Sequence, residues 1–559
     1  MCNILPVDNQ TITQNITAVT VNPFAGQRPG TSGLRKKTRE FMQPGYLEAF
    51  VQSAFNALRG SVSGDFSKST LVVGGDGRYY NKEAIQKILH IAIGNEFGRV
   101  MVARGGLLST PAMSAVIRRR KAFGGLVLSA SHNPGGIEAD FGIKYNVSNG
   151  GPAPEDVTER IYEFTQRINH YYWFTCNDID IRQEGKQTYA DTEVEIFDPL
   201  ADYTVLMSEL FDFDALREFF RGGFRMIFDG MHGSTGPYAA HILEQQLGAP
   251  KGTVLNGIPL EDFAGKHPDP NLVYAADLVR RMQASDAPDL GAANDADGDR
   301  NMILGRNVFI SPGDSLAVIA EHAARYIPGY RNGLAGIARS MPTSTAADRV
   351  AKSLSIPIYE TPTGWKYFGN LMDADLCTVC GEESFGTGSN HIREKDGFWA
   401  VLCWLSILCG TRKSVAEVMS AHWERFGRSY FQRHDYEGLD LSAATQMSEE
   451  LRPSLPALTG KDFGASRIAA ADDFTYTDPV DHSVTPRAGI RLALEDGSRV
   501  VCRLSGTGTQ GATLRVYLER FSRQYDQDSS RMLAPLAGSV RQLLRLKERF
   551  HREDPDVIT

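Results

Sequence analysis

Short apolar strands that run into glycine and polar residues, with helix-like segments after them, recur along this chain. LVV at 71–73 leads into GGDGR, MIF at 226–228 leads into DG, and GIA at 336–338 leads into RS. Repeated alternation of strand and helix is typical of α/β folds, in which loops at strand ends carry function. The pattern therefore predicts an α/β architecture with functional loops at the strand ends.

The pattern changes near residue 430. The segments 489–494 and 499–504 alternate apolar and polar residues, and a basic helix is expected over Leu533 to Arg552. Alternation with a period of two is typical of strands with one buried face. We therefore predict a smaller C-terminal α+β domain with an antiparallel sheet. At about 100–200 residues per domain, a chain of 559 residues holds three to five domains.

Composition excludes several classes of function. The formal net charge of -8 disfavours a general nucleic-acid binder, since affinity for phosphate backbones comes mainly from clustered lysine and arginine. No stretch approaches the roughly 18–20 apolar residues of a membrane span, and the most apolar run, Trp399 to Cys409, indicates a buried helix. The N-terminus lacks a basic start and a long apolar core, so we expect no secretory signal.

The seven cysteines form no recognisable framework, which fits a reducing cytoplasm. Cys377 and Cys380 form one CxxC pair. A structural zinc site needs four ligands, commonly supplied as two such pairs, and no second pair exists. Two buried thiols are the expected state.

Ser131 and His132 follow an apolar strand expected at Gly125–Leu128 and precede the turn NPGG at 133–136. Two interpretations are open at this point. A strand that delivers a nucleophile and an imidazole into a loop is a common way to build a reacting site on a rigid base. An ordinary strand-to-turn junction with capping serines has the same residues.

The second motif, NDADGDRN, spaces Asp295, Asp297 and Asp299 by two. In an extended or looped backbone these carboxylates can turn to one side and ligate a hard cation. A calcium-binding EF-hand is excluded, because Arg300 and Arg306 stand where that loop requires glycine and glutamate. The motif predicts a magnesium site that water or a phosphate oxygen would complete.

The third motif, RLSGTGTQGATLRVY at 503–517, combines glycines, hydroxyls and two arginines. Glycine lets backbone N–H groups approach an anion, and arginine offers a fixed fork for phosphate. No Gly-Lys-Ser/Thr follows, so this is not a Walker A loop. The predicted phosphate-binding residues are Arg503, Ser505, Gly506, Thr507, Thr509 and Arg515.

A fourth segment, CGEESFGTGSNHIREKDG at 380–397, concentrates titratable and hydrogen-bonding groups around glycines, including Glu382, Ser384, His391 and Lys395. Upstream, TPTGWK at 361–366 is a turn that opens into a helix. Such groups suit a charged polyhydroxyl ligand.

Together these motifs resemble, in order, those of the α-D-phosphohexomutases, most closely the phosphoglucomutase subgroup, which interconverts glucose 1-phosphate and glucose 6-phosphate. The resemblance runs from GTSGLRKK at 30–37 to the phosphate loop. It implies four domains around a central cleft, three of related mixed-sheet α/β topology and a fourth of TATA-binding-protein-like fold. We place them at 1–202, 203–312, 313–429 and 430–559.

The resemblance also implies a mechanism. Ser131 would carry a phosphoryl group and complete the ligands of one Mg²⁺ held by Asp295, Asp297 and Asp299. Glucose 1,6-bisphosphate would be the intermediate and activator, and its reorientation explains a separate site for the distal phosphate. The implied sugar contacts are Glu382 and Ser384, with Thr363 and Gly364 assisting, and the groups that would position the phosphoserine are Arg35, Lys144 and Arg300. His132 or Lys395 would transfer the proton, and either could be acid or base.

One residue departs from the family pattern: Ala296 stands where the metal loop often has glycine, which would matter if that position required a positive φ. A phosphomannomutase, a dual-specificity enzyme and a non-catalytic secretion-associated phosphoprotein are the alternatives. GEES in place of GExSGH favours glucose, and none of the motif residues is lost. The expected partners are sugar phosphates, with no nucleic acid and no membrane span, and we expect a cytoplasmic monomer or weak dimer.

Overall fold

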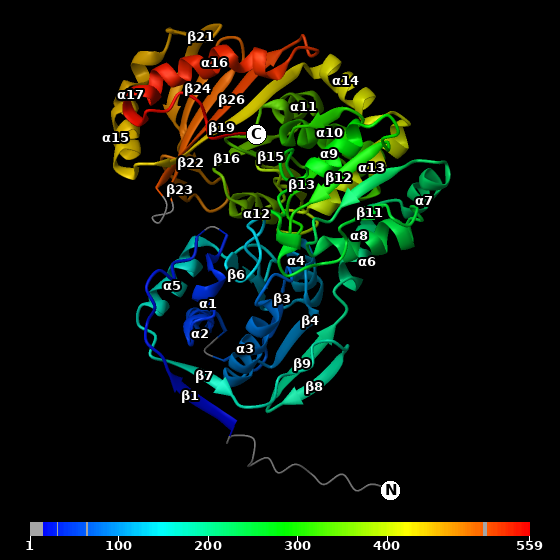
Figure 1. The fold of residues 1–559 in the computed structure, drawn as a ribbon, viewed down its shortest axis with the longest axis vertical. Coiled ribbons are helices and arrows are strands. Elements are labelled where there is room, and N and C mark those ends of the chain that lie inside the picture. The colour runs from blue at the N-terminus through cyan, green and yellow to red at the C-terminus, as the bar shows by residue number, and fades with distance from the viewer. Residues whose placement is uncertain (1–14, 31, 63–64, 507–510) are drawn as a thin grey trace. The chain divides into compact units, whose positions relative to one another are not determined.

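In the computed structural model, residues 15–30, 32–62, 65–506 and 511–559 are described (Figure 1). The chain divides into two compact units. Unit 1 comprises Met1–Leu304, Ile327–Gly329 and Gly386–Cys409, and unit 2 comprises Gly305–Tyr326, Tyr330–Phe385 and Gly410–Thr559. Each unit is described by itself, and the four domain ranges given above stay a prediction.

Unit 1 contains a seven-stranded mixed sheet in the order β2-β6-β5-β3-β4-β9-β8. Its central pairs, β3 with β4 and β5, and β4 with β9, are parallel, and its outer pairs are antiparallel. The strands are β2 (Leu34–Lys37), β3 (Thr70–Gly75), β4 (Arg99–Leu107), β5 (Gly124–Leu128), β6 (Asp140–Val147), β8 (Gly185–Tyr189) and β9 (Thr192–Phe197).

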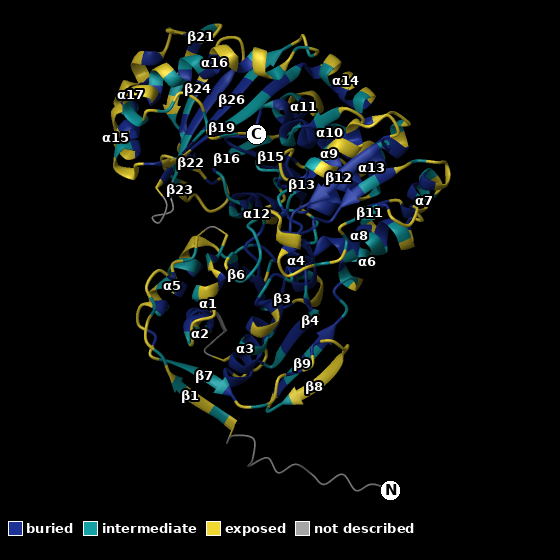
Figure 2. Ribbon diagram, in the orientation of Figure 1, coloured by how far each residue is buried: buried dark blue, intermediate teal, exposed yellow. Residues whose placement is uncertain are grey.

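Helices accompany this sheet: α1 (Thr38–Phe41), α2 (Tyr46–Leu58), α3 (Asn81–Gly94), α4 (Thr110–Arg120) and α5 (Glu155–Thr165). β1 (Ile16–Thr20) pairs with β7 (His170–Phe174) in a separate ribbon. Residues of β5 are buried throughout, as expected of a strand covered on both faces. Figure 2 shows the central strands as buried, and α2, which shares their hydrophobic cluster, is buried over nearly its whole length.

A second sheet in unit 1 carries the metal motif. β10 (Met226–Asp229) pairs in parallel with β11 (Val254–Leu255) and β12 (Leu290–Asn294), and β12 pairs antiparallel with β13 (Asn301–Gly305). The other elements of unit 1 are α6 (Ala201–Leu210), α7 (Phe213–Arg221), α8 (Thr235–Ala239), a π-helix (Ala240–Gln246), α9 (Ala276–Gln283), β18 (Thr387–Ser389) and α13 (Gly397–Thr411), which begins in this unit. α13 is buried from Gly397 to Cys409, which confirms the buried helix predicted there.

Unit 2 begins with β14 (Val308–Ile310) and contains a parallel set in which β15 lies between β16 and β17. The elements of this part are α10 (Pro312–Tyr326), β15 (Ile337–Ser340), α11 (Ala346–Leu354), β16 (Ile358–Thr361), α12 (Trp365–Asp373), β17 (Val379–Gly381) and α14 (Val415–Phe426). The side chains of Cys377 and Cys380 are buried in a cluster with Trp365 and Phe368, as expected.

The C-terminal part of unit 2 is a seven-stranded sheet in the order β20-β21-β24-β25-β26-β19-β27. Its strand pairs among the described residues are antiparallel, which confirms the predicted sheet type. Its strands are β19 (Arg428–Leu439), β20 (Asp462–Phe463), β21 (Ser466–Asp473), β24 (Ile490–Leu494), β25 (Arg499–Gly506), β26 (Ala512–Ser522) and β27 (Val557–Ile558). A small hairpin, β22 (Tyr476–Thr477) with β23 (Val484–Thr485), and the helix α15 (Leu441–Leu451) accompany it.

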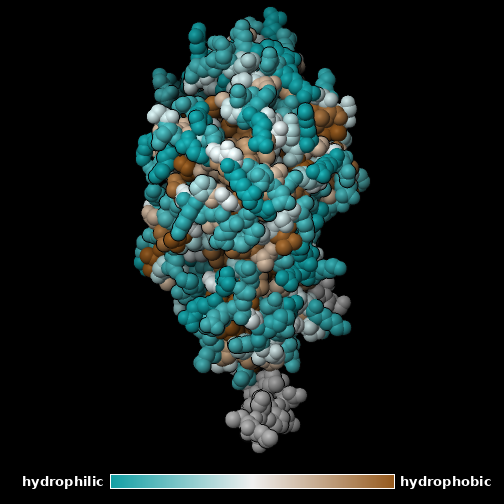
Figure 3. Space-filling view, turned by 90° about the vertical axis from the view of Figure 1, so that its right-hand side faces the viewer, coloured by the Kyte–Doolittle hydropathy of each residue, from teal (hydrophilic) through white to brown (hydrophobic). Residues whose placement is uncertain are grey.

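The single basic helix predicted over 533–552 is wrong in detail. The structure has α16 (Ser529–Leu544) followed by α17 (Leu546–Phe550), because Arg545 takes a left-handed φ of 52° and ends the first helix. Among the described residues, no helix is long and apolar enough to cross a membrane. On the face drawn in Figure 3, hydrophilic residues dominate and hydrophobic ones form small separate patches.

Candidate active site

Ser131 lies just beyond β5 in unit 1, where the chain leaves the sheet. Its φ is 51°, a left-handed conformation that is uncommon for residues other than glycine, and its side chain is buried. Ser131 Oγ donates to Asp295 Oδ2 at 2.9 Å, and His132 Nδ1 lies 3.3 Å from the same hydroxyl. The serine hydroxyl therefore faces the metal motif rather than capping a turn.

A buried network below the loop holds this strained backbone. Arg78 forms an ion pair with Asp76 at 2.8 Å and donates from Nη2 to the carbonyl oxygen of Ser131 at 2.7 Å. Ser129 Oγ donates to Asp76 and accepts from the Ser131 N–H, both at 2.7 Å. Both side chains of the ion pair are fully buried. Strained conformations persist where surrounding contacts over-determine them, as they do here.

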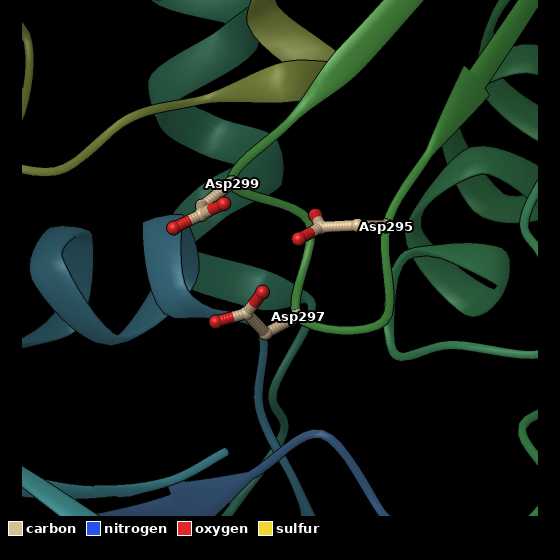
Figure 4. Close-up of side chains that lie close together, drawn as sticks. All are labelled: Asp295, Asp297 and Asp299. Atoms are coloured by element: carbon tan, nitrogen blue, oxygen red, sulfur yellow. The ribbon is translucent and has the colours of Figure 1, made fainter. Parts of the chain in front are cut away.

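The three aspartates of NDADGDRN lie on the loop between β12 and β13, and Figure 4 shows their carboxylates gathered around one space. One oxygen from each of Asp295, Asp297 and Asp299 lies within 4.8 Å of the others, and all three residues are buried. Burial first, and then the charges of the other two aspartates, raise the pKa of Asp295 well above its ordinary value. The proximity of these three buried carboxylates therefore disfavours the charged form of Asp295.

Ala296 does not have the positive φ that its replacement of glycine made a concern. The left-handed residue of the loop is Gly298, with φ of 80°, where an added Cβ would lie 2.3 Å from Thr235 Cγ2. The carbonyl oxygen of Ala296 instead accepts from the backbone N–H and hydroxyl of Ser234 at 2.7 and 2.9 Å. The alanine is compatible with the loop.

The donor set fits a hard divalent cation. Among the residues that the structure describes, Oδ1 of Asp297 and Oδ1 of Asp299 are buried and have no hydrogen-bond partner, while Asp297 Oδ2 accepts from Thr110 Oγ1 at 2.7 Å. Buried carboxylate oxygens are normally satisfied, so orphaned ones beside each other point to a missing ligand. Carboxylate oxygens are the ligands that Mg²⁺ prefers.

Cations surround the serine loop. Burial, followed by the charges of Arg300, Arg35 and Lys395, lowers the pKa of His132 well below its ordinary value. The imidazole is therefore neutral at neutral pH. Asp297 and Asp299 are in turn the closest anionic influences on Arg35, whose pKa is lowered mainly by burial. The sequence predicted His132, Arg35, Arg300 and Lys395 from separate motifs. In the structure, the charges of the three cations all act on His132.

Lys144, on β6, is held by a carboxylate that the sequence did not single out. Its Nζ lies 2.9 Å from Glu394 Oε1, and the same oxygen accepts from Asn146 Nδ2 at 2.9 Å. Burial acts to lower the pKa of Lys144, but Glu394, Asp297 and Asp299 outweigh it and the pKa is raised. Lys144 therefore stays charged beside the metal motif.

His391 supports the loop that carries Lys395. Its Nδ1 lies 2.6 Å from Ser389 Oγ, and its Nε2 lies 2.9 Å from Asp396 Oδ2. Asp396 also accepts from Tyr203 OH at 2.7 Å and from the backbone N–H of Trp399 at 2.9 Å. This buried serine–histidine–aspartate chain fixes the loop, and the stem of Lys395 packs against Gly386.

The predicted sugar contacts lie in unit 2, in the segments that directly follow β16 and β17. Glu382 is buried, and its Oε1 accepts from the backbone N–H of Gly364 at 3.1 Å, which joins the two segments predicted to contact the sugar. Gly364 has φ of 127°, so the turn before α12 needs glycine. Ser384 is half-buried.

The predicted phosphate residues lie on β25 and β26. Arg503 and Arg515 are directly opposite each other in the antiparallel ladder, as are Ser505 and Thr513. Like charges that face each other across a sheet destabilise it, so an anion between them would be favoured. Asp435, opposite Arg515 on β19, lies 3.9 Å from it, whereas the Arg503 guanidinium has no ion pair among the described residues. Gly506 ends β25, and Thr507 and Thr509 lie outside the described residues.

A cavity of about 310 Å³ in unit 2 joins the two predicted subsites. Thr363 from the sugar segment and Arg503 from the phosphate strand both line it, with Tyr367, Thr485 and Arg487. A cavity of this size is at the lower end of small-molecule sites.

Comparison with known proteins identifies the family. Models of phosphoglucomutase/phosphomannomutase α/β/α domains I, II and III match residues 26–172, 201–308 and 312–426, and a model of the phosphoglucomutase-1 C-terminal domain matches 428–556. The chain belongs to the phosphoglucomutase/phosphomannomutase family. This confirms the resemblance and the four-domain fold class, with three α/β domains and a C-terminal domain.

Relatives named phosphoglucomutase match over nearly the whole chain. One from Rhizobium radiobacter is 53% identical and covers 97% of this chain and 100% of its own length. A cytoplasmic one from Populus tremula is 49% identical, with 98% and 99% covered, and a chloroplastic one from Marchantia polymorpha is 50% identical, with 97% and 85% covered.

The crystal structure of the Paramecium exocytosis-sensitive phosphoprotein pp63/parafusin, described as a phosphoglucomutase in an open form, has a TM-score of 0.91 and 47% identity. It covers 97% of this chain and 99% of its own. A Thermus thermophilus protein described as a putative phosphomannomutase, 20% identical with a TM-score of 0.68, shares the fold.

Sequence reasoning missed the network of Asp76, Arg78 and Ser129, and the support from Thr110 and Glu394. The sequence contained one signal for Asp76 and Arg78. GGDGR follows β3, which is the parallel neighbour of β5, so both loops leave the same edge of the sheet. Polar groups at that edge gather at the site in such folds.

Proposed function

We propose that this protein is a phosphoglucomutase that interconverts glucose 1-phosphate and glucose 6-phosphate through a phosphorylated Ser131 and a glucose 1,6-bisphosphate intermediate. The observation that carries the proposal is Ser131 Oγ at 2.9 Å from Asp295 Oδ2, at the edge of three buried carboxylates, two of which have an oxygen without a partner among the described residues. A serine that only capped a turn would have no reason to face such a cluster. The relatives named above support the choice of hexose.

Asp295, Asp297 and Asp299 would hold one Mg²⁺, with an oxygen on Ser131 as a further ligand. When bound, the ion neutralises charge that develops on the phosphoryl group as it moves. Arg35, Lys144 and Arg300 would position the phosphoserine by contacting its oxygens, since all three surround the carboxylates without filling their orphaned oxygens.

In the transfer, the bond from phosphorus to Ser131 Oγ breaks as a bond forms to the free hydroxyl oxygen of the sugar phosphate. The proton of that hydroxyl passes to a base, and Ser131 Oγ takes up a proton as it leaves the phosphorus. In the second half-reaction Ser131 gives up a proton as it accepts the other phosphoryl group, and the freed sugar oxygen takes one. The candidates are His132, whose Nδ1 lies 3.3 Å from the Ser131 hydroxyl, and Lys395, whose charge acts on His132.

Substrate recognition would divide between two subsites. Glu382 and Ser384, with Thr363 and Gly364, would bind sugar hydroxyls, and Arg503, Ser505, Gly506, Thr507, Thr509 and Arg515 would bind the distal phosphate. The shared cavity that Thr363 and Arg503 line supports this division. We further propose a cytoplasmic monomer or weak dimer.

One alternative is a phosphomannomutase or a dual-specificity mutase of the same family. A coupled assay of the purified protein with glucose 1-phosphate and with mannose 1-phosphate, each with and without Mg²⁺, separates these possibilities. We expect kcat/KM for glucose 1-phosphate to exceed that for mannose 1-phosphate at least about tenfold, which corresponds to about 1.4 kcal/mol. Equal values would favour dual specificity.

The phosphoserine is tested with Ser131→Ala. We expect activity to fall by about a thousandfold or more, and incubation with labelled glucose 1,6-bisphosphate to label only the wild type. Ser148→Ala, which removes an exposed hydroxyl of unit 1, is the matched control and should keep the label. Full activity in Ser131→Ala would refute the mechanism, and a folded but inactive wild type would leave a non-catalytic phosphoprotein.

A further inference from the structure

The link between β15 and α11, residues 340–345, touches the sugar-binding segment in unit 2. We call it the tether loop. Ser340 Oγ donates to Glu383 Oε2 at 2.7 Å, and Thr343 Oγ1 lies 2.7 Å from Ser340 Oγ and 3.4 Å from Glu383 Oε2. Glu383 is buried and directly follows Glu382, so the tether loop fixes the backbone of the proposed sugar contact.

The C-terminal sheet holds the other side of the tether loop. Arg499, on β25, donates to the carbonyl oxygens of Met341, at 2.9 Å, and Thr343. Glu519, directly opposite Arg499 on β26, accepts from the backbone N–H and the hydroxyl of Thr345 at 2.8 and 2.7 Å. The cross-strand pair Arg499 and Glu519 therefore forms hydrogen bonds with both ends of the tether loop.

Arg499 and Arg503 lie on the same face of β25. Side chains alternate along a strand, so residues 499, 501, 503 and 505 point to one side, and Arg499 and Arg503 are about 13 Å apart along it. Val501, between them, packs with Met341 and Tyr517 in a small apolar cluster. The strand that carries the phosphate residues is thus anchored to the tether loop four residues earlier.

The charges around Arg499 do not explain the contacts with the loop. Glu360 Oε1 accepts from Arg499 Nη1 at 2.9 Å, but Glu360 also pairs with Arg339 and Arg491. Arg499 is only 8% exposed, and burying its charge is costly. Its distinctive contribution is the fork that reaches two carbonyl oxygens of one loop at once.

We propose that Arg499 is a positioning residue that fixes the spacing between the sugar subsite at Glu382 and the phosphate subsite at Arg503. The inference rests on the proposed function. A hexose phosphate must contact both subsites, whereas inorganic phosphate needs only one. Loss of Arg499 should therefore weaken ligands that span the subsites and spare a ligand that does not.

The test compares the wild type with Arg499→Met and Arg499→Lys. We expect Arg499→Met to raise KM for glucose 1-phosphate about tenfold or more, since misplacement of binding groups by about 1 Å can cost up to about a hundredfold in rate. The inhibition constant for inorganic phosphate should change less than about twofold. Arg499→Lys keeps a charge but lacks the planar fork, so we expect its KM to lie between those of the wild type and Arg499→Met.

Arg491→Gln is the matched control. Arg491 pairs with the same Glu360 and with Asp472, and among the described residues it has no hydrogen bond or ion pair with the tether loop. We expect its KM to stay within about twofold of the wild type. If Arg491→Gln raised KM as much as Arg499→Met, or if phosphate inhibition weakened in parallel with KM, the spacing role would be wrong.

Ser340→Ala removes the donor to Glu383 at the opposite end of the link and leaves the buried charges around Arg499 in place. It should reproduce the same pattern, a raised KM with unchanged phosphate inhibition, even if Arg499→Met does not fold. An unchanged KM in folded Ser340→Ala would overturn the proposal. An inactive wild type that still binds phosphate would instead refute the proposed function alone.

Discussion

The two units build their sites from opposite charges in opposite settings. In unit 1, three buried aspartates surround a serine hydroxyl, and the backbone at Ser131 is strained. In unit 2, Arg503 and Arg515 face each other on regular strands, and Arg503 lines a cavity. The like charges of the first site are buried, whereas those of the second lie half-exposed on the paired strands β25 and β26.

In the function proposed above, this difference separates the site of chemistry from the site of binding. Electrostatic stabilisation of moving charge is strongest where water is excluded, which favours a buried site that is costly for the empty protein. Recognition of a phosphate that arrives from solvent needs only a preorganised cationic surface. Unit 1 therefore requires more support from its surroundings, as the Asp76–Arg78 pair illustrates.

The largest expected effect comes from neutralising one member of the acidic cluster. Asp295→Asn should lower activity by about a thousandfold and abolish the rise in unfolding temperature that Mg²⁺ gives the wild type, which is worth about 2.7 kcal/mol at a hundred times Kd. In EDTA, the variant should unfold at a higher temperature than the wild type, because it relieves like-charge repulsion. Thermal unfolding with and without Mg²⁺ measures both.

Exposed Asp286→Asn is the control for this experiment and should respond to Mg²⁺ as the wild type does. A wild type that is more stable than Asp295→Asn in EDTA would show that the carboxylates do not repel one another in the way that their burial implies.

Loss of the Asp76–Arg78 ion pair below Ser131 should have the next largest effect. Arg78→Met leaves Asp76 buried without its partner, which typically costs about 3–5 kcal/mol, and releases the Ser131 carbonyl. We expect a lower free energy of unfolding in urea and a kcat reduced about 10–100-fold with little change in KM. Arg104→Met, which breaks an exposed pair with Glu184, should change stability by less than about 1 kcal/mol.

The phosphate strand should behave differently. Arg503→Gln removes a charge that faces Arg515, so we expect the free energy of unfolding to stay unchanged or rise by about 0.2–1 kcal/mol while KM for glucose 1-phosphate rises about 10–30-fold. Arg520→Gln, on the same strand pair but bonded to Met532 O, should leave KM unaltered. A large loss of stability in Arg503→Gln would remove the contrast between the two sites.

The smallest effect concerns acid stability of unit 2. Burial, with a contribution from Arg541, lowers the pKa of His434 to about 4. The unfolded chain therefore binds a proton below its ordinary pKa of about 6.5 that the folded chain does not, and stability falls as pH drops from about 6.5 to 4. Between pH 7 and pH 5, the free energy of unfolding of His434→Asn should fall by about 1–2 kcal/mol less than that of the wild type, as measured by urea unfolding. An equal loss in both proteins would contradict this cause.

Much of the fold followed from local patterns. β5, the helix over Trp399–Cys409 and the antiparallel strands β24 and β25 lie where the sequence predicts them, since apolar runs and alternation reflect burial directly. The C-terminal helix was predicted as one because nothing in its sequence signals the left-handed turn at Arg545. The roles of the site residues stay predictions.

The sequence by itself determined the residue types and their spacing: three aspartates two apart, a serine and histidine after a strand, two arginines around glycines. Only the tertiary structure decided that Ser131 meets Asp295, 164 positions away, that Gly298 rather than Ala296 takes the positive φ, and that Arg503 faces Arg515. The reason is physical. Local motifs are set by neighbouring residues, whereas contacts between distant segments depend on the packing of whole sheets, which must repay the entropy of closing long loops.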